Sequence, residues 1–307
     1  MNSRILITGS EGLVGSALRV ALEARGIDVV GLDLRGPRGE DGDVRDARRV
    51  RAAVAGCHGI VHLAAVSRVV WGEHDPEGCW DTNVGGLHTV VEAAGGQSAW
   101  RPWLVFASSR EVYGQPDRLP VTEDAPLRPV NVYGRSKVEG ERLVEAARGK
   151  GVRAAVVRLS NVYGSTRDHA DRVVPAFARA AVRGGDLRVE GEAHTFDFTH
   201  LNDTIRGIVA LIDLLSKGQA PPPPPVHLLT GRPCTLGRLA TLAVDLAETE
   251  TPPILRAPPR AFDVSRFYGN PARARSLLGW IPRVGLRQGL GRLIRDFRQK
   301  EIEETAP

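Results

Sequence analysis

The 307-residue sequence contains only three cysteines, Cys57, Cys79 and Cys234, and no two of them form a Cys-x-x-Cys pair. Such widely spaced residues indicate free thiols in a reducing compartment, and they argue against disulfides or a zinc site. We expect no metal centre. No apolar run approaches the length of a membrane-spanning helix. We therefore expect a soluble, cytoplasmic protein without a membrane segment.

The sequence also lacks any long run of basic residues. Lys and Arg number 41 against 36 Asp and Glu, which gives a net charge of +5. The basic residues are scattered among acidic ones and are not interleaved with aromatic residues, so we expect no nucleic-acid partner. A small positive surplus suits a phosphorylated small substrate.

The first half alternates short apolar runs with stretches of helical periodicity. We expect strands at residues 4–8, 27–34, 59–65, 103–109 and 152–159, and helices at 13–25, 47–55, 83–94 and 133–147. Strands that alternate with helices are typical of a parallel sheet covered on both faces. The pattern therefore predicts an α/β fold with a doubly wound parallel sheet of the Rossmann type.

The second half is less regular. We expect helices at 173–183, 204–215, 236–247 and 285–298, a strand at 226–230, and a stiff spacer at Pro221–Pro225 that cannot be helical. This change predicts a Rossmann domain over residues 1–165, to which parts of about 200–231 return. Residues 166–307 would form a smaller α/β domain that binds the substrate.

A glycine-rich turn connects the first expected strand and helix. Gly9, Gly12 and Gly15 would let the backbone approach a pyrophosphate, which would rest on the helix N-terminus. The spacing Gly-x-x-Gly-x-x-Gly differs from the commoner Gly-x-Gly-x-x-Gly, and a plain strand-helix turn is the alternative. Asp33 ends the second strand, where a carboxylate binds an adenosine ribose and favours NAD over NADP. Arg35 nearby weakens that preference.

Tyr133 and Lys137 are four residues apart in an expected helix, so they share one face. A tyrosine beside a fixed cation ionises more easily than a free one, whose pKa is about 10. Such a phenol would act as a proton acceptor near neutral pH. Ser109 lies upstream, at the end of the fourth strand.

Together these segments resemble the extended short-chain dehydrogenase/reductase family, and within it the NAD-dependent nucleotide-sugar epimerases and dehydratases. The resemblance covers nearly the whole chain. Its elements are Thr8–Gly15, Asp43–Asp46, His62–Ala65, Asn83, Ser108–Gly114, Tyr133-x-x-x-Lys137 and Leu278–Trp280.

The resemblance implies that the first domain binds NAD. The implied NAD-binding residues are Gly9, Gly12, Leu13, Val14, Gly15, Asp33, Asp43, Val44, Leu63, Ala64, Ala65, Asn83, Ser108, Tyr133 and Lys137. Asp43 and Val44 would contact the adenine. Asn83 would hold the geometry near Lys137.

The resemblance also implies catalytic and substrate-binding roles. Ser109 would bond the sugar oxygen at C4, Tyr133 would take the C4 hydroxyl proton, and Lys137 would bind the nicotinamide ribose. The substrate would be a nucleoside-diphosphate sugar, bound by Ser67, Ser109, Asn161 and Arg260.

Similar proteins often carry Arg-Asp-Phe where this chain has Phe196-Asp197-Phe198. A phosphate-facing arginine is therefore missing at residue 196. Candidates to replace it are Arg179, Arg183 and Arg188.

The outcome of the reaction depends on Arg110 and Glu111. A 4-epimerase needs only the serine, tyrosine and lysine, whereas a dehydratase needs a further acid/base pair. Glu111 occupies the position of the glutamate in dehydratases and is a candidate catalytic residue, but Arg110 replaces the neighbouring acid and cannot supply a proton. Arg110 would bind a substrate carboxylate, as in a uronic acid, or pair with Glu111 on the surface.

We favour 4-epimerisation, with 4,6-dehydration or uronic-acid decarboxylation through Glu111 as the alternative. A second alternative is an NAD-binding sensor or scaffold without turnover. Similar proteins often dimerise through two helices, here those at 83–94 and 133–147, so we expect a homodimer.

Overall fold

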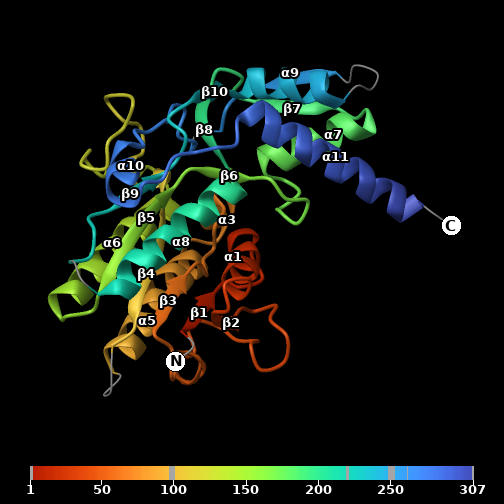
Figure 1. Cartoon of the computed structure of the whole chain (residues 1–307). Coiled ribbons are helices and arrows are strands. Elements are labelled where there is room, and N and C mark those ends of the chain that lie inside the picture. Colours follow the sequence, from red (N-terminus) through yellow and green to blue (C-terminus); the bar gives the residue numbers. More distant parts are fainter. Residues whose placement is uncertain (1–2, 97–100, 219–220, 248–252, 261, 306–307) are drawn as a thin grey trace.

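The computed structural model describes residues 3–96, 101–218, 221–247, 253–260 and 262–305. A six-stranded sheet flanked by helices forms one part, and helices with short strands form a smaller part beside it (Figure 1). Within these ranges, no helix is both long enough and apolar enough to cross a membrane.

The large sheet is parallel throughout. Its strands are β1 (Arg4–Thr8), β2 (Asp28–Leu32), β3 (Gly59–His62), β4 (Trp103–Ser109), β5 (Ala154–Leu159) and β9 (Val226–Leu228). Their order is β2-β1-β3-β4-β5-β9, and every neighbouring pair runs in the same direction. The expected doubly wound parallel sheet is confirmed.

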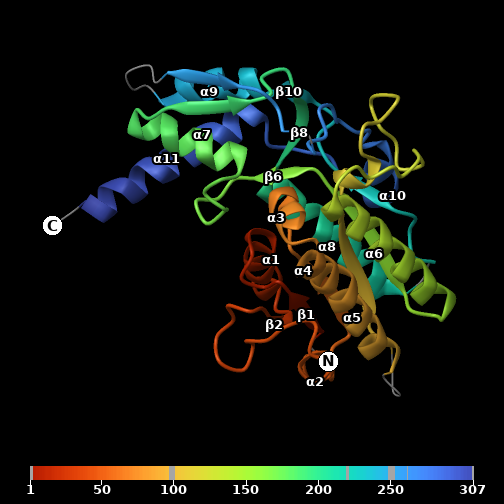
Figure 2. The ribbon, with the colours of Figure 1, turned by 180° about the vertical axis from the view of Figure 1, so that it is seen from behind.

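Helices cover both faces of this sheet (Figures 1 and 2). One face carries α1 (Leu13–Glu23) and α8 (Leu201–Lys217), and the other carries α2 (Ala47–Val54), α5 (Gly86–Gly95) and α6 (Val132–Gly149). Along β4, Val105 packs on the first side while Leu104 and Phe106 pack on the second. Because both faces of the sheet are buried, the sequences of its strands are nearly continuous runs of apolar residues. The pairing of two copies through α5 and α6 stays a prediction.

The smaller part is built on two small sheets. The strands β6 (Asn161–Tyr163), β8 (Thr195–His200) and β10 (Pro233–Thr235) form one, and β7 (Leu187–Glu190) and β11 (Ile254–Ala257) form the other. Three helices pack with them around one core, α7 (Val173–Arg183), α9 (Leu236–Ala247) and α11 (Leu286–Thr305). A shorter helix, α10 (Ala272–Leu278), packs on α8 and β9 of the larger part.

The predicted bounds are correct to the residue for β1, β4, α7 and α9. The predicted helix at 83–94 is wrong in its first turn. There the chain forms two short helices, α3 (Val69–His74) and α4 (Pro76–Trp80), and a wide π turn, η1 (Asp81–Gly85), before α5 begins. Asn83 lies buried in that turn, and such wide turns are frequent at functional sites. The last helix ends at Thr305, seven residues beyond its predicted end at Arg298, and its final turns are held by a bond from Gln299 to Glu303.

A buried ion pair attaches α6 to the sheet. Glu141 of α6 accepts two hydrogen bonds from Arg158 of β5, at 2.6 and 2.9 Å, and the two side chains are only 9% and 4% exposed. Ser108 of β4 donates a third bond to Glu141 at 2.5 Å. Arg158 also donates to the Tyr113 hydroxyl at 2.6 Å. The pair is therefore fully hydrogen-bonded, as a buried charge must be.

Removing one partner of this pair should destabilise the protein strongly. We expect Glu141→Leu to lower the free energy of unfolding by about 3–5 kcal/mol, because Arg158 would remain buried and unpaired. The double substitution Glu141→Leu/Arg158→Met should recover at least half of that loss, measured by urea unfolding. A double variant no more stable than Glu141→Leu would contradict this account.

Candidate active site

A cavity of about 970 Å³ lies at the carboxyl ends of the parallel strands and extends to the smaller part of the molecule. Ligands of open parallel sheets bind at this edge. Every predicted cofactor, substrate and catalytic residue lines the cavity except Asn83. Residues from Gly9 to Asp263 thus meet in one place, although their individual roles stay predictions.

The glycine turn leaves no room for side chains. Gly9 has a φ of +72°, and a Cβ there would lie 2.7 Å from the Ala64 nitrogen. A Cβ on Gly15 would lie 2.1 Å from the Gly9 carbonyl oxygen. Gly12 caps α1, so the N-terminal N–H groups of this helix face the cavity. This cradle is suited to a phosphate group.

Asp33 directs its carboxylate to the rim of the glycine turn. Its oxygens accept backbone N–H bonds from Glu11 at 3.0 Å and from Arg35 at 2.9 Å. The Arg35 side chain is 65% exposed and lies 3.6 Å from Asp33, so it binds this carboxylate only loosely. Asp43, further along the rim, is held by Arg45, whose hydrogen bonds lower the pKa of Asp43.

Ser109, Tyr133 and Lys137 converge on one wall of the cavity. Ser109 ends β4, Tyr133 lies in the first turn of α6, and Lys137 lies one turn later. Asn131 caps this helix by accepting a 2.7 Å bond from the Gly134 N–H. The Lys137 ammonium donates to the Ala107 carbonyl at 2.9 Å and lies 5.7 Å from the centre of the Tyr133 ring.

Burial dominates the electrostatics of this pair. It raises the pKa of Tyr133 to about 12, against opposing effects of Ser109 and Arg172, and it lowers the pKa of Lys137 to about 8. The expected depression of the tyrosine pKa is therefore not found in the protein alone. The physical reason is that loss of hydration disfavours the phenolate more than its neighbours stabilise it.

Asn83 acts from behind the cavity wall. Its amide accepts the Val66 N–H at 2.8 Å and donates to the Ser136 hydroxyl at 2.9 Å. It thereby joins the segment after β3 to the residue next to Lys137. This is a positioning contact near Lys137, and the expected contact of Asn83 with the cofactor stays a prediction.

Arg110 and Glu111 form a buried pair at the cavity, and not a surface pair. The Arg110 Nη2 lies 2.7 Å from Glu111 Oε1, and the side chains are 12% and 6% exposed. The other carboxylate oxygen of Glu111 accepts a bond from Asn131 at 2.8 Å. The Arg110 guanidinium stacks 4.4 Å from the centre of the Phe196 ring, and its buried Nη1 has no partner among the described residues.

The remaining predicted substrate residues, Ser67, Asn161 and Arg260, also line the cavity. Asn161 donates to the Asp197 carbonyl at 3.2 Å, and Ser67 accepts a bond from Arg172 at 3.2 Å. Arg260 pairs with Asp263 at 2.9 Å and with Glu190 at 3.5 Å, which partly neutralises its charge.

Only one of the three candidates for the missing arginine reaches the cavity. Arg188 lines it and pairs with Glu190 at 3.1 Å. Arg179 instead stacks on Phe297, and Arg183 pairs with Glu301. The latter two predictions are wrong, because α7 turns both side chains toward α11.

The segment 167–172, which the sequence analysis missed, covers part of the cavity. His169 packs edge-on against Trp71 of α3 at 4.9 Å, and Asp171 pairs with Arg68 at 2.6 Å. Asp168 is buried, which raises its pKa, and its Oδ2 has no hydrogen-bond partner among the described residues. The closely spaced charges of Arg167–Arg172 were the only signal in the sequence.

His58 and His62 are four residues apart, yet they do not form a metal site. His58 accepts the Arg4 N–H before β3, whereas His62 pairs with Thr8 inside the sheet at 2.8 Å. Within the described ranges, no three His, Cys, Asp or Glu side chains are grouped as metal ligands.

Solved structures similar to this chain share its whole architecture. The protein MoeE5, solved in complex with UDP-glucose and NAD, is 26% identical with a TM-score of 0.88, and the match covers 98% of this chain and 100% of that one. DesIV, a dTDP-glucose 4,6-dehydratase from Streptomyces venezuelae with NAD and TYD bound, is 26% identical with a TM-score of 0.88 and 98% coverage of both chains.

A curated relative, the UDP-glucose 4-epimerase of Streptomyces lividans, is 36% identical over 167 residues. That alignment spans 49% of this chain and only 50% of the relative's length. The model of the NAD dependent epimerase/dehydratase family matches residues 5–223, which is more than half of the chain. The chain therefore belongs to the NAD dependent epimerase/dehydratase family.

Proposed function

We propose that this protein is an NAD-dependent 4-epimerase of a UDP-linked sugar. The observation that carries the proposal is the pairing of Glu111 with Arg110 and Asn131, beside an intact set of Ser109, Tyr133 and Lys137. Similar proteins support a UDP-sugar as the substrate. The Streptomyces lividans relative is named a UDP-glucose 4-epimerase, and MoeE5 was solved in complex with UDP-glucose.

The cavity residues fit NAD. The glycine cradle accepts a pyrophosphate, and Asp33 offers a carboxylate to a ribose diol. The buried Lys137 ammonium has three donors, of which only the one to Ala107 is used among the described residues. Its remaining donors suit the hydroxyls of a second ribose.

The side chains of the chain would handle the proton at C4. Ser109 would bond the C4 oxygen, and Tyr133 would accept the hydroxyl proton and later return it. NAD, when bound, supplies reversible oxidation at that carbon. Lys137 would keep a positive charge close to the phenol during proton transfer.

Glu111 separates epimerisation from dehydration. A dehydratase acid must reach C5 or C6 of the sugar with a free carboxyl oxygen. Both oxygens of Glu111 are already engaged, one by Arg110 and one by Asn131. Stacking on Phe196 further holds Arg110 in place, so the pair favours a structural role.

On the substrate side, Asn161 and Arg260 would contact the diphosphate, and Ser67 the sugar. The unpartnered Oδ2 of Asp168 would accept a hydrogen bond from a sugar hydroxyl. This would satisfy a buried acceptor whose loss of hydration is otherwise costly.

We expect Tyr133→Phe to lower kcat by about a thousandfold or more, because proton transfer at C4 would lack its base. Binding of NAD, measured by fluorescence titration, should be unchanged. Tyr163→Phe is the matched control, since it also removes a buried hydroxyl, one without a hydrogen-bond partner in the described chain. Full activity of Tyr133→Phe would refute the mechanism.

Incubation with UDP-glucose, UDP-glucuronate and dTDP-glucose should yield an isomer of unchanged mass from one of the UDP-sugars. Glu111→Gln should still produce that isomer, and Glu139→Gln, at a partly exposed position on α6, serves as its control. Mass spectrometry of the products decides the outcome. Loss of water or of carbon dioxide, abolished by Glu111→Gln, would establish the alternative reaction instead.

Lys137→Met should stabilise the cofactor-free protein at pH 7, by roughly 2–3 kcal/mol. The pKa of Lys137 is about 8 in the folded chain against 10.5 for the free side chain, so folding opposes its charge. This penalty is complete below pH 8 and disappears as the pH rises past 10.5, above which the side chain is neutral in both states.

Urea unfolding of Lys137→Met and wild type between pH 7 and pH 10 measures the difference. The gap should shrink as the pH rises. Exposed Lys150→Met should show no such trend. A gap that is independent of pH would contradict the assigned shift.

A further inference from the structure

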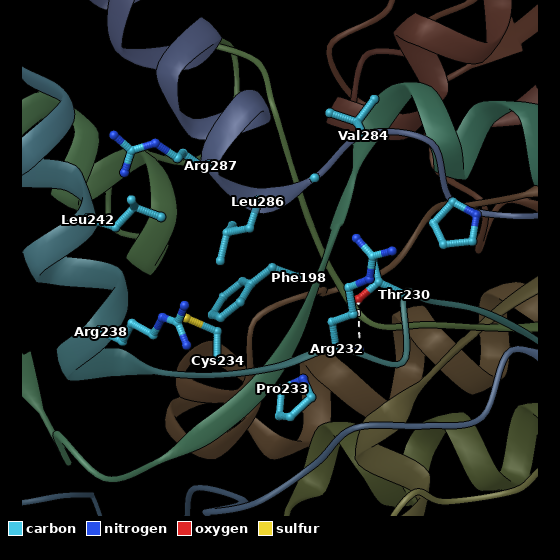
Figure 3. A pocket seen from close by; sticks show the side chains of 12 residues that line it. Phe198, Thr230, Arg232, Pro233, Cys234, Arg238, Leu242, Val284, Leu286 and Arg287 are labelled. Atoms are coloured by element: carbon cyan, nitrogen blue, oxygen red, sulfur yellow. Dashed lines mark hydrogen bonds between the residues drawn. The ribbon is translucent and has the colours of Figure 1, made fainter.

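A second cavity of about 380 Å³ lies in the smaller part of the molecule (Figure 3). It is enclosed by β8, β10, the start of α9 and the segment that leads into α11. Its lining includes Phe198, Arg232, Arg238, Leu242, Leu286 and Arg287. Of these, only Phe198 belongs to the strand β8, and Phe196 of the same strand lines the first cavity instead.

The charge of this cavity is entirely positive. Arg232, Arg238 and Arg287 line it, and no carboxylate does. None of the three guanidinium groups forms an ion pair with a described residue, whereas Arg260 at the first cavity has two carboxylate partners. Figure 3 shows Arg238 reaching toward Cys234 and Arg232 rising on the other side of Phe198, while Arg287 points away from the centre. An anion bound by Arg232 would give this guanidinium group a partner.

The start of α11 adds to this potential. The first bond within the helix runs from the Gly289 N–H to the Gly285 carbonyl, so the N–H groups of Leu286 and Arg287 precede the helical ladder. Such N–H groups favour negative charge close to them.

The rest of the lining is apolar. Phe198 and Leu286 lie between the two arginines in Figure 3, and Leu242 lies beside Arg238. A ligand that fits this combination has a flat apolar group joined to a phosphate, because aromatic faces and aliphatic side chains bury the one and guanidinium groups bind the other.

The second cavity is connected to the first through Asp197. The Asp197 carboxylate accepts bonds from the Thr230 N–H at 2.9 Å and the Gly231 N–H at 2.6 Å, which holds the loop that carries Arg232. The Asp197 carbonyl accepts the bond from Asn161. Phe198 is also the direct register partner of Asn161 in the β6–β8 ladder.

We propose that the second cavity binds a small phosphorylated ligand with a flat apolar group, and that this ligand tightens nucleotide binding in the first cavity. A phosphate bound by Arg232 fixes the loop at Thr230 and, through Asp197, the amide of Asn161. The coupling rests on the proposed function, because it takes UDP as the nucleotide.

Isothermal titration with phenyl phosphate tests the site itself, in the presence of saturating NAD and UDP to fill both parts of the first cavity. We expect one site with a Kd below about 1 mM. The double variant Arg232→Ala/Arg238→Ala should weaken it at least about tenfold, through loss of charge-assisted bonds. Arg48→Ala/Arg51→Ala on α2, also exposed, is the control of equal charge. Equal binding to wild type and to the first double variant would overturn the site.

Titration with UDP, with and without saturating phenyl phosphate, tests the coupling. The Kd of UDP should fall by roughly fivefold in wild type and stay constant in Arg232→Ala/Arg238→Ala. An unchanged Kd in wild type would overturn the coupling. If UDP itself fails to bind, the proposed substrate is wrong, while the titration with phenyl phosphate still decides whether the second site exists.

Discussion

The ion pair of Glu141 with Arg158 fixes α6 on the sheet, and the geometry of the active site follows from this contact. Tyr133, Lys137 and Glu141 are spaced by four residues and form one stripe along the helix. Glu141 binds Ser108 and Arg158, while Lys137 binds the carbonyl of Ala107. The stripe is therefore aligned with the last three residues of β4, of which Ser109 is the third. A shift of α6 along its axis would break these bonds together.

The same arrangement makes the site costly to fold. An ammonium and a phenol are buried side by side. Loss of hydration lowers the pKa of Lys137 to about 8 and raises the pKa of Tyr133 to about 12, so it disfavours the charged form of each. Lys137 makes one bond to a backbone carbonyl, fewer than its donors allow. Buried donors without acceptors lower the stability of the protein when the site is empty. A ligand that accepts their hydrogen bonds restores this stability. The buried Oδ2 of Asp168 likewise lacks a hydrogen-bond partner among the described residues.

Local patterns predicted the parts of the fold that depend on local physics. Continuous apolar runs indicated strands buried on both faces, and β4 and α9 were correct to the residue. The glycine turn was predictable because only glycine fits where Gly9 and Gly15 lie. The three-residue strands β6, β9 and β10 are too short for a clear period, and two of them were missed. Arg172 could not be assigned, since its partner Ser67 lies 105 residues away.

The position of Arg110 explains how this cavity can do without an arginine at residue 196. The Phe196 ring is the surface on which the Arg110 guanidinium stacks, at 4.4 Å. An arginine at 196 would place a second cation against the first in a buried site, where repulsion is poorly screened. Phe196 instead stabilises Arg110 through its ring face, and Glu111 balances the charge. The positive charge at this wall thus comes from Arg110, directly after β4, and not from β8, and Glu111 balances it.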